Sequence, residues 1–167
     1  MTQLLTFEDG ARQAAHLASF LRIPSTTVSV HRFPDGETKI TLPPALPPRV
    51  LLYRSLNDPN AKLTELMLAA RTARDLGARE LILVAPYLCY MRQDMAFSPG
   101  EAISQRIIGR FLADLFDTVI TVDPHLHRVR ELKDAVPARH AIARSEEHTS
   151  EPQSHLNLVC RLLLEKK

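Results

Sequence analysis

Two short polar segments of this chain carry the side chains best suited to chemistry. Arg92, Gln93 and Asp94 follow one apolar run, and Asp123 and His125 follow the next. A guanidinium is a planar fork of donors that suits a phosphate or the face of a base, and a glutamine amide can read a purine edge. An aspartate and a histidine can hold a divalent metal ion or its water shell. Taken singly, such residues are more often solvated surface groups or parts of simple turns.

Two buried strands must bring these segments together. Residues 81–85 and 119–122 are short apolar runs rich in Leu and β-branched residues, which indicates fully buried strands of a parallel sheet. A predicted helix over residues 101–116 connects them as a right-handed crossover. Parallel strands end at the same edge of a sheet, and ligands of open sheets bind outside that edge. The polar residues after the two strands are therefore predicted to form one site.

Helices and strands alternate through the rest of the chain. Apolar stripes at helical spacing predict helices over residues 7–21 and 61–76, and residues 50–53 are predicted to be the first strand of the main sheet. This alternation predicts a three-layer α/β domain with a parallel sheet. On the helix over residues 101–116 we expect the buried residues to be Ile103, Ile107, Ile108, Phe111, Leu112 and Leu115.

Two connecting segments differ from ordinary loops. Residues 26–32 and 38–42 alternate in polarity around the segment Phe33–Glu37, whose Asp-Gly pair is typical of a hairpin turn. On these residues alone, a plain connecting turn is the alternative. Residues 86–100 form a long polar loop, and loops of this length inside compact domains are usually functional.

The composition is that of a globular protein without a strong charge bias. The 167 residues are 45% hydrophobic and 24% charged, with a formal net charge of +2, enough for one domain with a sizeable core. No basic cluster favours nucleic acid, and no apolar run is long enough to span a membrane. Cys89 and Cys160 are far apart and outside metal-ligand spacing, which favours a reduced, cytoplasmic setting.

Four motifs are more informative together, in their order along the chain, than each is alone. They are the segments 33–37 (Phe-Pro-Asp-Gly-Glu), 86–94 (Pro-Tyr to Arg-Gln-Asp), 99–104 (Pro-Gly-Glu-Ala-Ile-Ser) and 121–125 (Thr-Val-Asp-Pro-His). Together they resemble the ribose-phosphate pyrophosphokinase family, also called phosphoribosyl-pyrophosphate synthetases, over about residues 4 to 140. The resemblance implies a phosphoribosyltransferase-like parallel sheet with a β-hairpin flap. It also implies an Mg²⁺-dependent transferase of nucleotide biosynthesis, which passes the diphosphoryl group of ATP to ribose 5-phosphate to give phosphoribosyl pyrophosphate and AMP.

The resemblance gives the hairpin a role in ATP binding. Phe33, Asp35, Gly36 and Glu37 match the family's hairpin, which reaches the ATP bound largely by a neighbouring subunit. A homo-oligomer is therefore expected, with ATP and ribose 5-phosphate as its small-molecule partners. Neither nucleic acid nor a membrane is expected as a partner.

The resemblance also assigns roles to the residues after the two buried strands. Arg92, Gln93 and Asp94 match the ATP contacts at the start of the family's flexible catalytic loop. His125 matches the catalytic histidine linked to Mg²⁺–ATP, and Asp123 stands beside it as a second metal ligand. Charge on a triphosphate must be met by metal and cations, because phosphoryl transfer depends mostly on positioning and electrostatics.

The chain departs from the family pattern in two places. The family usually has basic residues after Arg-Gln-Asp, where this chain has Met95 and Ala96. The family's second half carries a loop for ribose 5-phosphate and a loop with a catalytic lysine and arginine, and neither has a counterpart in these 167 residues. We expect residues 1–143 to be the N-terminal domain of such an enzyme, inactive alone.

The composition changes after Ala143. Residues 144–154 are polar and without period, and they resemble the translation of a common sequencing-adapter oligonucleotide. We therefore expect residues 144–167 to be a tail foreign to the protein. A genuine polar linker with a short terminal helix is the alternative.

Other functions stay open beside the diphosphokinase. A non-catalytic regulatory homologue would not need the retained Asp35, Glu37, Arg92, Gln93 and His125. A phosphoribosyltransferase of the same fold would need an acidic pair followed by Thr-Gly-Gly-Thr, which the sequence lacks. A purely structural α/β module is the third alternative.

Overall fold

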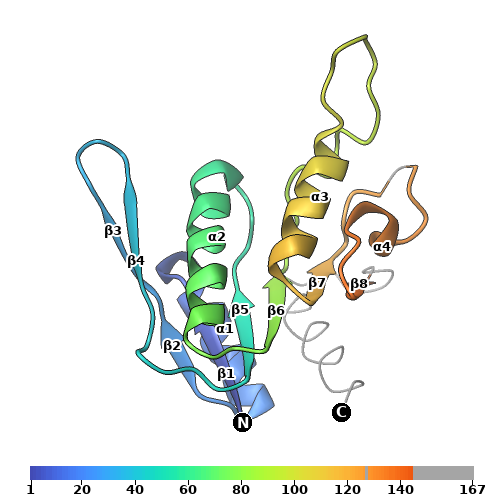
Figure 1. The fold of residues 1–167 in the computed structure, drawn as a ribbon. Helices are drawn as coiled ribbons and strands as arrows, with labels where there is room; N and C mark the ends of the chain where they lie inside the picture. Colours follow the sequence, from blue (N-terminus) through green and yellow to red (C-terminus); the bar gives the residue numbers. More distant parts are fainter. Residues whose placement is uncertain (127, 145–167) are drawn as a thin grey trace.

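The computed structural model describes residues 1–126 and 128–144, and within them six parallel strands form one sheet (Figure 1). The strand order is β2-β1-β5-β6-β7-β8. The strands are β1 (Thr2–Thr6), β2 (Ser25–Thr27), β5 (Arg49–Tyr53), β6 (Glu80–Ala85), β7 (Thr118–Val122) and β8 (His140–Arg144). The predicted parallel α/β sheet is confirmed.

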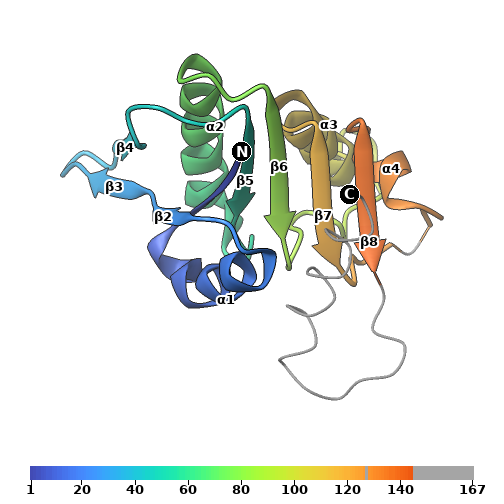
Figure 2. The same ribbon diagram turned by 90° about the horizontal axis from the view of Figure 1, so that it is seen from below.

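Helices cover both faces of this sheet, as a three-layer fold requires. They are η1 (Glu8–Gly10, a 3-10 turn), α1 (Ala11–Leu21), α2 (Pro59–Asp75), α3 (Ser104–Leu115) and α4 (Leu132–Ala135). Alternate strand residues point to opposite faces. Leu51 packs in one buried cluster with Leu17 of α1, whereas Leu52 packs in the other with Leu66 of α2. Figure 2 shows α1 on one side of the sheet and α2 and α3 on the other.

The order of strand addition reverses inside the sheet. From β1 the chain passes through α1 to β2 on one side, and the next strand of the sheet, β5, pairs with β1 on the other side. Strands β6, β7 and β8 then follow outward from β5. The topological switch point, where open α/β sheets bind ligands, therefore lies between β1 and β5.

The predicted hairpin is present as a separate two-stranded sheet. Strands β3 (Ser29–Arg32) and β4 (Thr38–Thr41) pair antiparallel, with Val30 opposite Ile40. The hairpin projects beyond the strand ends, on the far side of α2 from α3 (Figure 1). The predicted strand over residues 26–32 is split, because Val28 is buried and donates its N–H to the Thr6 carbonyl. Residues before Val28 therefore join the main sheet and residues after it join the hairpin.

The first strand of the sheet was predicted wrongly. It is β1 rather than the segment over residues 50–53, and β1 lies between β2 and β5. Its apolar content is confined to Leu4 and Leu5, both fully buried. So short a run has no helical or strand period of its own, and pairing on both edges is what makes it a strand.

The βα alternation also continues further than predicted. Helix α4 and strand β8 follow β7, and α4 packs so closely on α3 that a Cβ on Gly109 would lie 1.8 Å from the Ala135 carbonyl oxygen. Arg144 is the last residue of β8, and residues 145–167 of the predicted foreign tail lie outside the described residues. Among the described residues, no helix combines the length and apolar character needed to cross a bilayer.

The buried face of α3 differs from the prediction. Leu112 and Leu115 are buried, but Ile107 is 57% exposed, and Ile103, Ile108 and Phe111 are half-buried. The helix turns Gln105 and Gly109 inward instead. The amide side chain of Gln105 donates to the Met91 carbonyl, so a polar residue anchors the loop before α3 at a position that an apolar stripe cannot reveal.

Candidate functional site

Loops after β6 and β7 form a small cavity at the carboxyl edge of the sheet. It has a volume of about 220 Å³ and is lined by Tyr87, Leu88, Tyr90, Met91, Arg92, Gln93 and His125. Arg92 and His125 are exposed, and Gln93 is half-buried. The strand-end argument predicted that Arg92, Gln93 and His125 would meet, and all three line this cavity.

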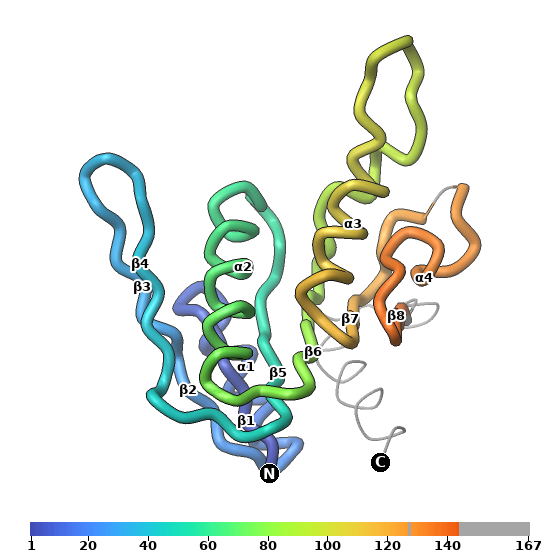
Figure 3. Tube along the Cα trace, in the orientation of Figure 1, coloured from blue at the N-terminus to red at the C-terminus, as the bar shows by residue number. Residues whose placement is uncertain are grey.

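The loop between β6 and α3 is closed at its base by hydrogen bonds. The Gln93 side-chain amide donates to the Met95 carbonyl (3.1 Å) and to the Glu101 carboxylate (3.5 Å). The same carboxylate accepts the Phe97 N–H at 2.7 Å, which lowers the pKa of Glu101. Beyond these contacts the loop extends away from the body of the domain (Figure 3). The loop therefore has a hydrogen-bonded base and an exposed tip.

Asp94 lies outside the cavity and has a partner that the sequence did not suggest. Its side chain is 1% exposed and bonds to Arg128, with 2.7 Å between Oδ1 and Nη1. The Arg128 guanidinium also lies 5.8 Å from the centre of the Phe97 ring. Arg128 thus joins the loop after β7 to the loop after β6. No spacing rule in the sequence points to it, because the two residues are 34 positions apart.

Two residues in the loops after β6 and β7 have left-handed backbone conformations. Tyr90 has φ 59° and Asp123 has φ 47°, a region that costs energy for residues other than glycine and clusters at functional sites. The Tyr90 hydroxyl donates to the side chain of Asn60, near the start of α2. The backbone is therefore held in place at the mouth of the cavity.

The metal prediction rests on Asp123 and His125. Within the described ranges, no three His, Cys, Asp or Glu side chains gather as a metal cluster. Magnesium is usually held by one or two carboxylates together with waters and substrate phosphates. The exposed Asp123 carboxylate fits the first part of that set, and the remaining ligands would come from a nucleotide and from water. The imidazole of His125 is a softer ligand than Mg²⁺ prefers.

The predicted hairpin residues lie apart from this cavity. Phe33, Asp35, Gly36 and Glu37 are exposed at the hairpin tip, where Asp35 accepts the Glu37 N–H and Gly36 has φ 93°. Helix α2 stands between the hairpin and the loop before α3 in Figure 1. Within one chain, the structure therefore does not bring the hairpin tip together with Arg92 and His125.

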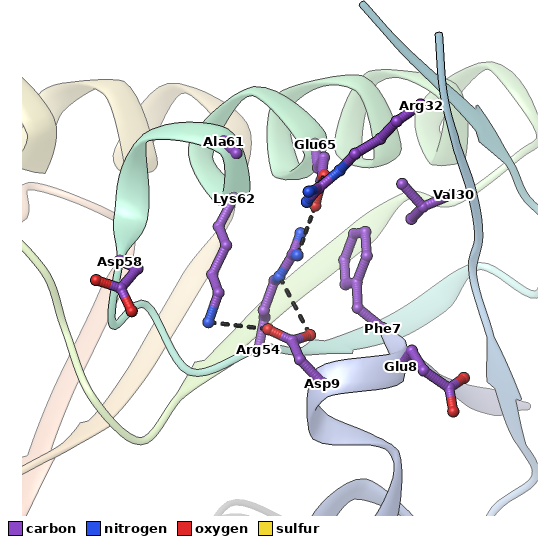
Figure 4. A pocket seen from close by; sticks show the side chains of 10 residues that line it. All are labelled: Phe7, Glu8, Asp9, Val30, Arg32, Arg54, Asp58, Ala61, Lys62 and Glu65. Atoms are coloured by element: carbon purple, nitrogen blue, oxygen red, sulfur yellow. Dashed lines mark hydrogen bonds and ion pairs between the residues drawn. The ribbon is translucent and has the colours of Figure 1, made fainter. Parts of the chain in front are cut away.

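A second, larger cavity lies at the switch point and was not predicted. It has a volume of about 690 Å³, and Figure 4 shows its charged lining. Arg54, directly after β5, is surrounded by Asp9, Glu65 and Phe7, and its guanidinium carbon lies 3.8 Å from the centre of the Phe7 ring. Burial, with the Asp9 carboxylate adding to it, raises the pKa of the nearby Tyr53 to about 12.

The sequence held one partial signal for this cavity. Arg54 follows a predicted strand end, as Arg92 does, so the same edge rule applies to it. Asp9 has no such signal, because β1 was not predicted. Glu65 has none either, since it occupies a helix whose apolar stripe was assigned without it.

The fold and the cavities define an open, doubly wound α/β domain of the ligand-binding kind. The sequence profile of one family, described as the N-terminal domain of ribose phosphate pyrophosphokinase, matches residues 2–116. The chain belongs to the ribose-phosphate pyrophosphokinase family.

Individual relatives agree with this assignment. The chain is 35% identical over 144 residues to the ribose-phosphate pyrophosphokinase of Methanopyrus kandleri, covering 86% of this chain and 49% of the relative. It is 43% identical over 112 residues to that of Saccharolobus solfataricus, covering 65% and 38%. The crystal structure of phosphoribosylpyrophosphate synthetase from Mycobacterium smegmatis shares the fold, with a TM-score of 0.74, 19% identity, and coverage of 87% and 48%. The chain spans about half the length of the curated relatives it matches, or less.

Proposed function

We propose that this chain is the nucleotide-binding half of a ribose-phosphate diphosphokinase, which transfers the diphosphoryl group of ATP to ribose 5-phosphate. The observation that carries the proposal is the cavity of about 220 Å³ that gathers Arg92, Gln93 and His125 from two loops. A cation, an amide and an imidazole converging at a strand edge suit a nucleotide better than an uncharged ligand. Family membership gives the reaction class.

The proposed roles follow from the chemistry of each side chain. The exposed Arg92 guanidinium meets the phosphates or stacks on the base, and Gln93 hydrogen-bonds the base edge. Asp123 and His125 would hold the metal–nucleotide complex at the strand end. Bound Mg²⁺ would neutralise charge on the transferring group. The protein's part is to hold the nucleotide in line with the sugar, because such transfers depend on positioning and electrostatics.

We propose that Asp94 acts through Arg128 rather than on ATP directly. The 2.7 Å ion pair between them holds the two loops that line the cavity. The hairpin residues Phe33, Asp35 and Glu37 favour assembly, because within one chain helix α2 stands between the hairpin and the loop before α3 (Figure 1). On this proposal they serve the nucleotide of a second subunit, in a cytoplasmic homo-oligomer.

The test joins this chain to the C-terminal half of a relative, since the chain spans about half of the relatives' length. Fused to the C-terminal half of the Methanopyrus kandleri relative, residues 1–144 should release AMP from ATP only when ribose 5-phosphate is present. Changing His125→Ala or Arg92→Gln should lower that rate by at least a hundredfold. The matched control is Arg71→Gln, because Arg71 is exposed on α2 away from both cavities.

The unfused chain provides the second arm of this test. Without the C-terminal half that the relatives carry beyond the matched region, it should form no measurable phosphoribosyl pyrophosphate, because holding both reactants in line is worth roughly 7–11 kcal/mol. Turnover by the 167 residues alone would contradict the proposal. So would a fusion that folds, by circular dichroism, and is indifferent to His125→Ala.

A further inference from the structure

The cavity at the switch point has the features of a binding site of its own. Its floor comes from the ends of β1 and β5, one wall from helix α2, and the other wall from the hairpin. A volume of about 690 Å³ lies within the usual range for small-molecule pockets. Its position is the one at which open α/β sheets bind ligands. The proposed nucleotide cavity, by contrast, lies between β6 and β7.

The charges in this cavity are arranged around a single buried carboxylate. Glu65, 1% exposed, accepts an ion pair from Arg32 at 3.1 Å on one oxygen and from Arg54 at 2.5 Å on the other. Arg54 is also paired with Asp9, at 3.6 Å, and Asp9 accepts Lys62 at 2.8 Å. Three cationic side chains therefore share two carboxylates.

This network leaves hydrogen-bond donors unused. The Arg54 side chain is 5% exposed, its Nη1 atom has no hydrogen-bond partner within the described residues, and its Nε atom has only the 3.6 Å ion pair with Asp9, which is too long for a hydrogen bond. Buried guanidinium donors without acceptors are unfavourable. Glu8 and Asp58 also line the cavity, but they are exposed, and in Figure 4 their carboxylates point away from Arg54. They do not complete the network.

We propose that the switch-point cavity binds a small phosphate-bearing molecule, whose phosphate bridges the guanidinium groups of Arg32 and Arg54. Two guanidinium forks around one carboxylate leave donors for a tetrahedral oxyanion, which has enough acceptor atoms for both forks. Arg32 is the accessible member of the two, since its side chain is 66% exposed and that of Arg54 is 5% exposed, and in Figure 4 both reach toward Glu65. The rest of the cavity leaves room for the carbon skeleton of the ligand beside Phe7 and Val30.

Further carboxylates in the lining set which phosphate compounds fit. Glu8 and Asp58 line the cavity as exposed residues, and like charges disfavour a polyanion such as a triphosphate. A monoester with hydroxyl groups can instead donate hydrogen bonds to these carboxylates. The site is therefore expected to prefer a phosphate monoester to ATP, which separates it from the proposed nucleotide cavity.

The test is calorimetric titration of the full 167-residue chain at low salt with glycerol 3-phosphate, inorganic phosphate and acetate as separate probes. We expect saturable binding of both phosphate probes, at least tenfold tighter than acetate. Tighter binding of glycerol 3-phosphate than of inorganic phosphate assigns the site to an ester, and the reverse assigns it to free phosphate. In both cases phosphate is the group recognised.

Variants locate the binding. Arg32→Gln removes the exposed fork and leaves the Arg54–Glu65 pair intact, so the chain should fold while its dissociation constant rises at least tenfold. Arg32→Lys, which keeps the charge without the fork, should regain only part of this loss. Arg71→Gln, with the same charge change on the exposed face of α2, should change the constant less than twofold. Hydrogen exchange of β3, β4 and the first turns of α2 should slow on binding.

Three results would overturn the inference. They are the absence of saturable phosphate binding, an equal loss in Arg32→Gln and Arg71→Gln, and a loss in Arg92→Gln with none in Arg32→Gln. The last result would assign phosphate to the cavity between β6 and β7, and it would leave the proposed diphosphokinase function intact. The two proposals can therefore fail separately.

Discussion

The two cavities at the carboxyl edge of the sheet are built in opposite ways. The cavity between β6 and β7 is lined by loop residues, and Arg92 and His125 among them are exposed. The cavity at the switch point has charged groups inside the domain, where Arg54 and Glu65 are buried against each other. Substitution of the exposed Arg92 or His125 is expected to leave the core intact, whereas substitution of the buried Arg54 or Glu65 is not.

Because of this difference, substitutions at the two sites should have different effects on ligand binding and on stability. Exposed charges interact weakly in water and are free to change partners with a ligand. Buried charges are costly unless paired, so removing one partner destabilises the fold strongly. Substitutions should therefore act on ligand binding at the β6–β7 cavity and on both binding and folding at the switch point.

The largest effect is expected for Glu65→Ala. This change leaves Arg54 buried without its closest carboxylate, and breaking a buried pair in this way costs about 3–5 kcal/mol. Denaturant unfolding of the full chain should show that loss. His125→Ala, at an exposed position, should change the free energy of unfolding by less than about 0.5 kcal/mol. Similar losses of unfolding free energy in the two variants would contradict the expected difference between the two cavities.

A smaller loss is expected for Asp94→Asn. The Asp94 carboxylate is the buried charge of the β6–β7 side, and its partner Arg128 is 56% exposed. Loss of a hydrogen bond to a charged group costs about 1–3 kcal/mol. Hydrogen exchange should quicken in the loop over residues 94–101 more than in β6. Uniform quickening through the sheet would show that Asp94 supports the core rather than the loop.

Acid titration provides a reference outside both cavities. Asp117, between α3 and β7, has its pKa lowered: burial raises it, but hydrogen bonds from the Leu81 N–H and Arg74 and the charge of Arg74 outweigh that effect. A carboxyl with a lowered folded-state pKa stabilises the fold above its ordinary pKa, and that contribution is lost as pH falls through the lower value. Asp117→Asn should therefore flatten the unfolding free energy between about pH 4 and the acid limit. An unchanged acid profile would show that Asp117 is not involved.

The smallest effect is expected at the loop tip. Phe97 is 65% exposed, so Phe97→Ala should change the free energy of unfolding by less than about 0.5 kcal/mol. The same exposure should make residues 95–100 an early site of limited proteolysis, with ATP and Mg²⁺ slowing the cut if the loop closes over nucleotide. Cleavage elsewhere first, or exchange as slow as in β6, would argue against a mobile lid.

A further test concerns the reactivity of one buried thiol. Cys89 follows β6 and is 2% exposed, and burial raises the pKa of its thiol to about 11. Because the thiolate is the reactive form, iodoacetamide at pH 8 should modify Cys89 only on unfolding, measured in a Cys160→Ser variant. Rapid labelling of the folded chain would show that the buried segment after β6 opens.

Most of the fold and part of the site followed from local patterns in the sequence. Strands β6 and β7 are apolar runs long enough to be recognised alone, and the edge rule then places Arg92, Gln93 and His125 together. The hairpin followed from its Asp-Gly turn. By contrast, β1, α4 and β8 were missed, because short segments become regular only when neighbours pair or pack with them.

The sequence by itself determined the longer elements and the neighbouring ends of β6 and β7, since a crossover fixes which strand ends are neighbours. Tertiary structure alone decided the switch-point cavity. Arg32 and Glu65 are 33 residues apart and belong to a hairpin and a helix, and Asp9 and Arg54 follow strands that pair across the reversal of strand order. Ion pairs between such elements have no periodic signature, because only the packing of the helix and the hairpin against the sheet brings the charges within range.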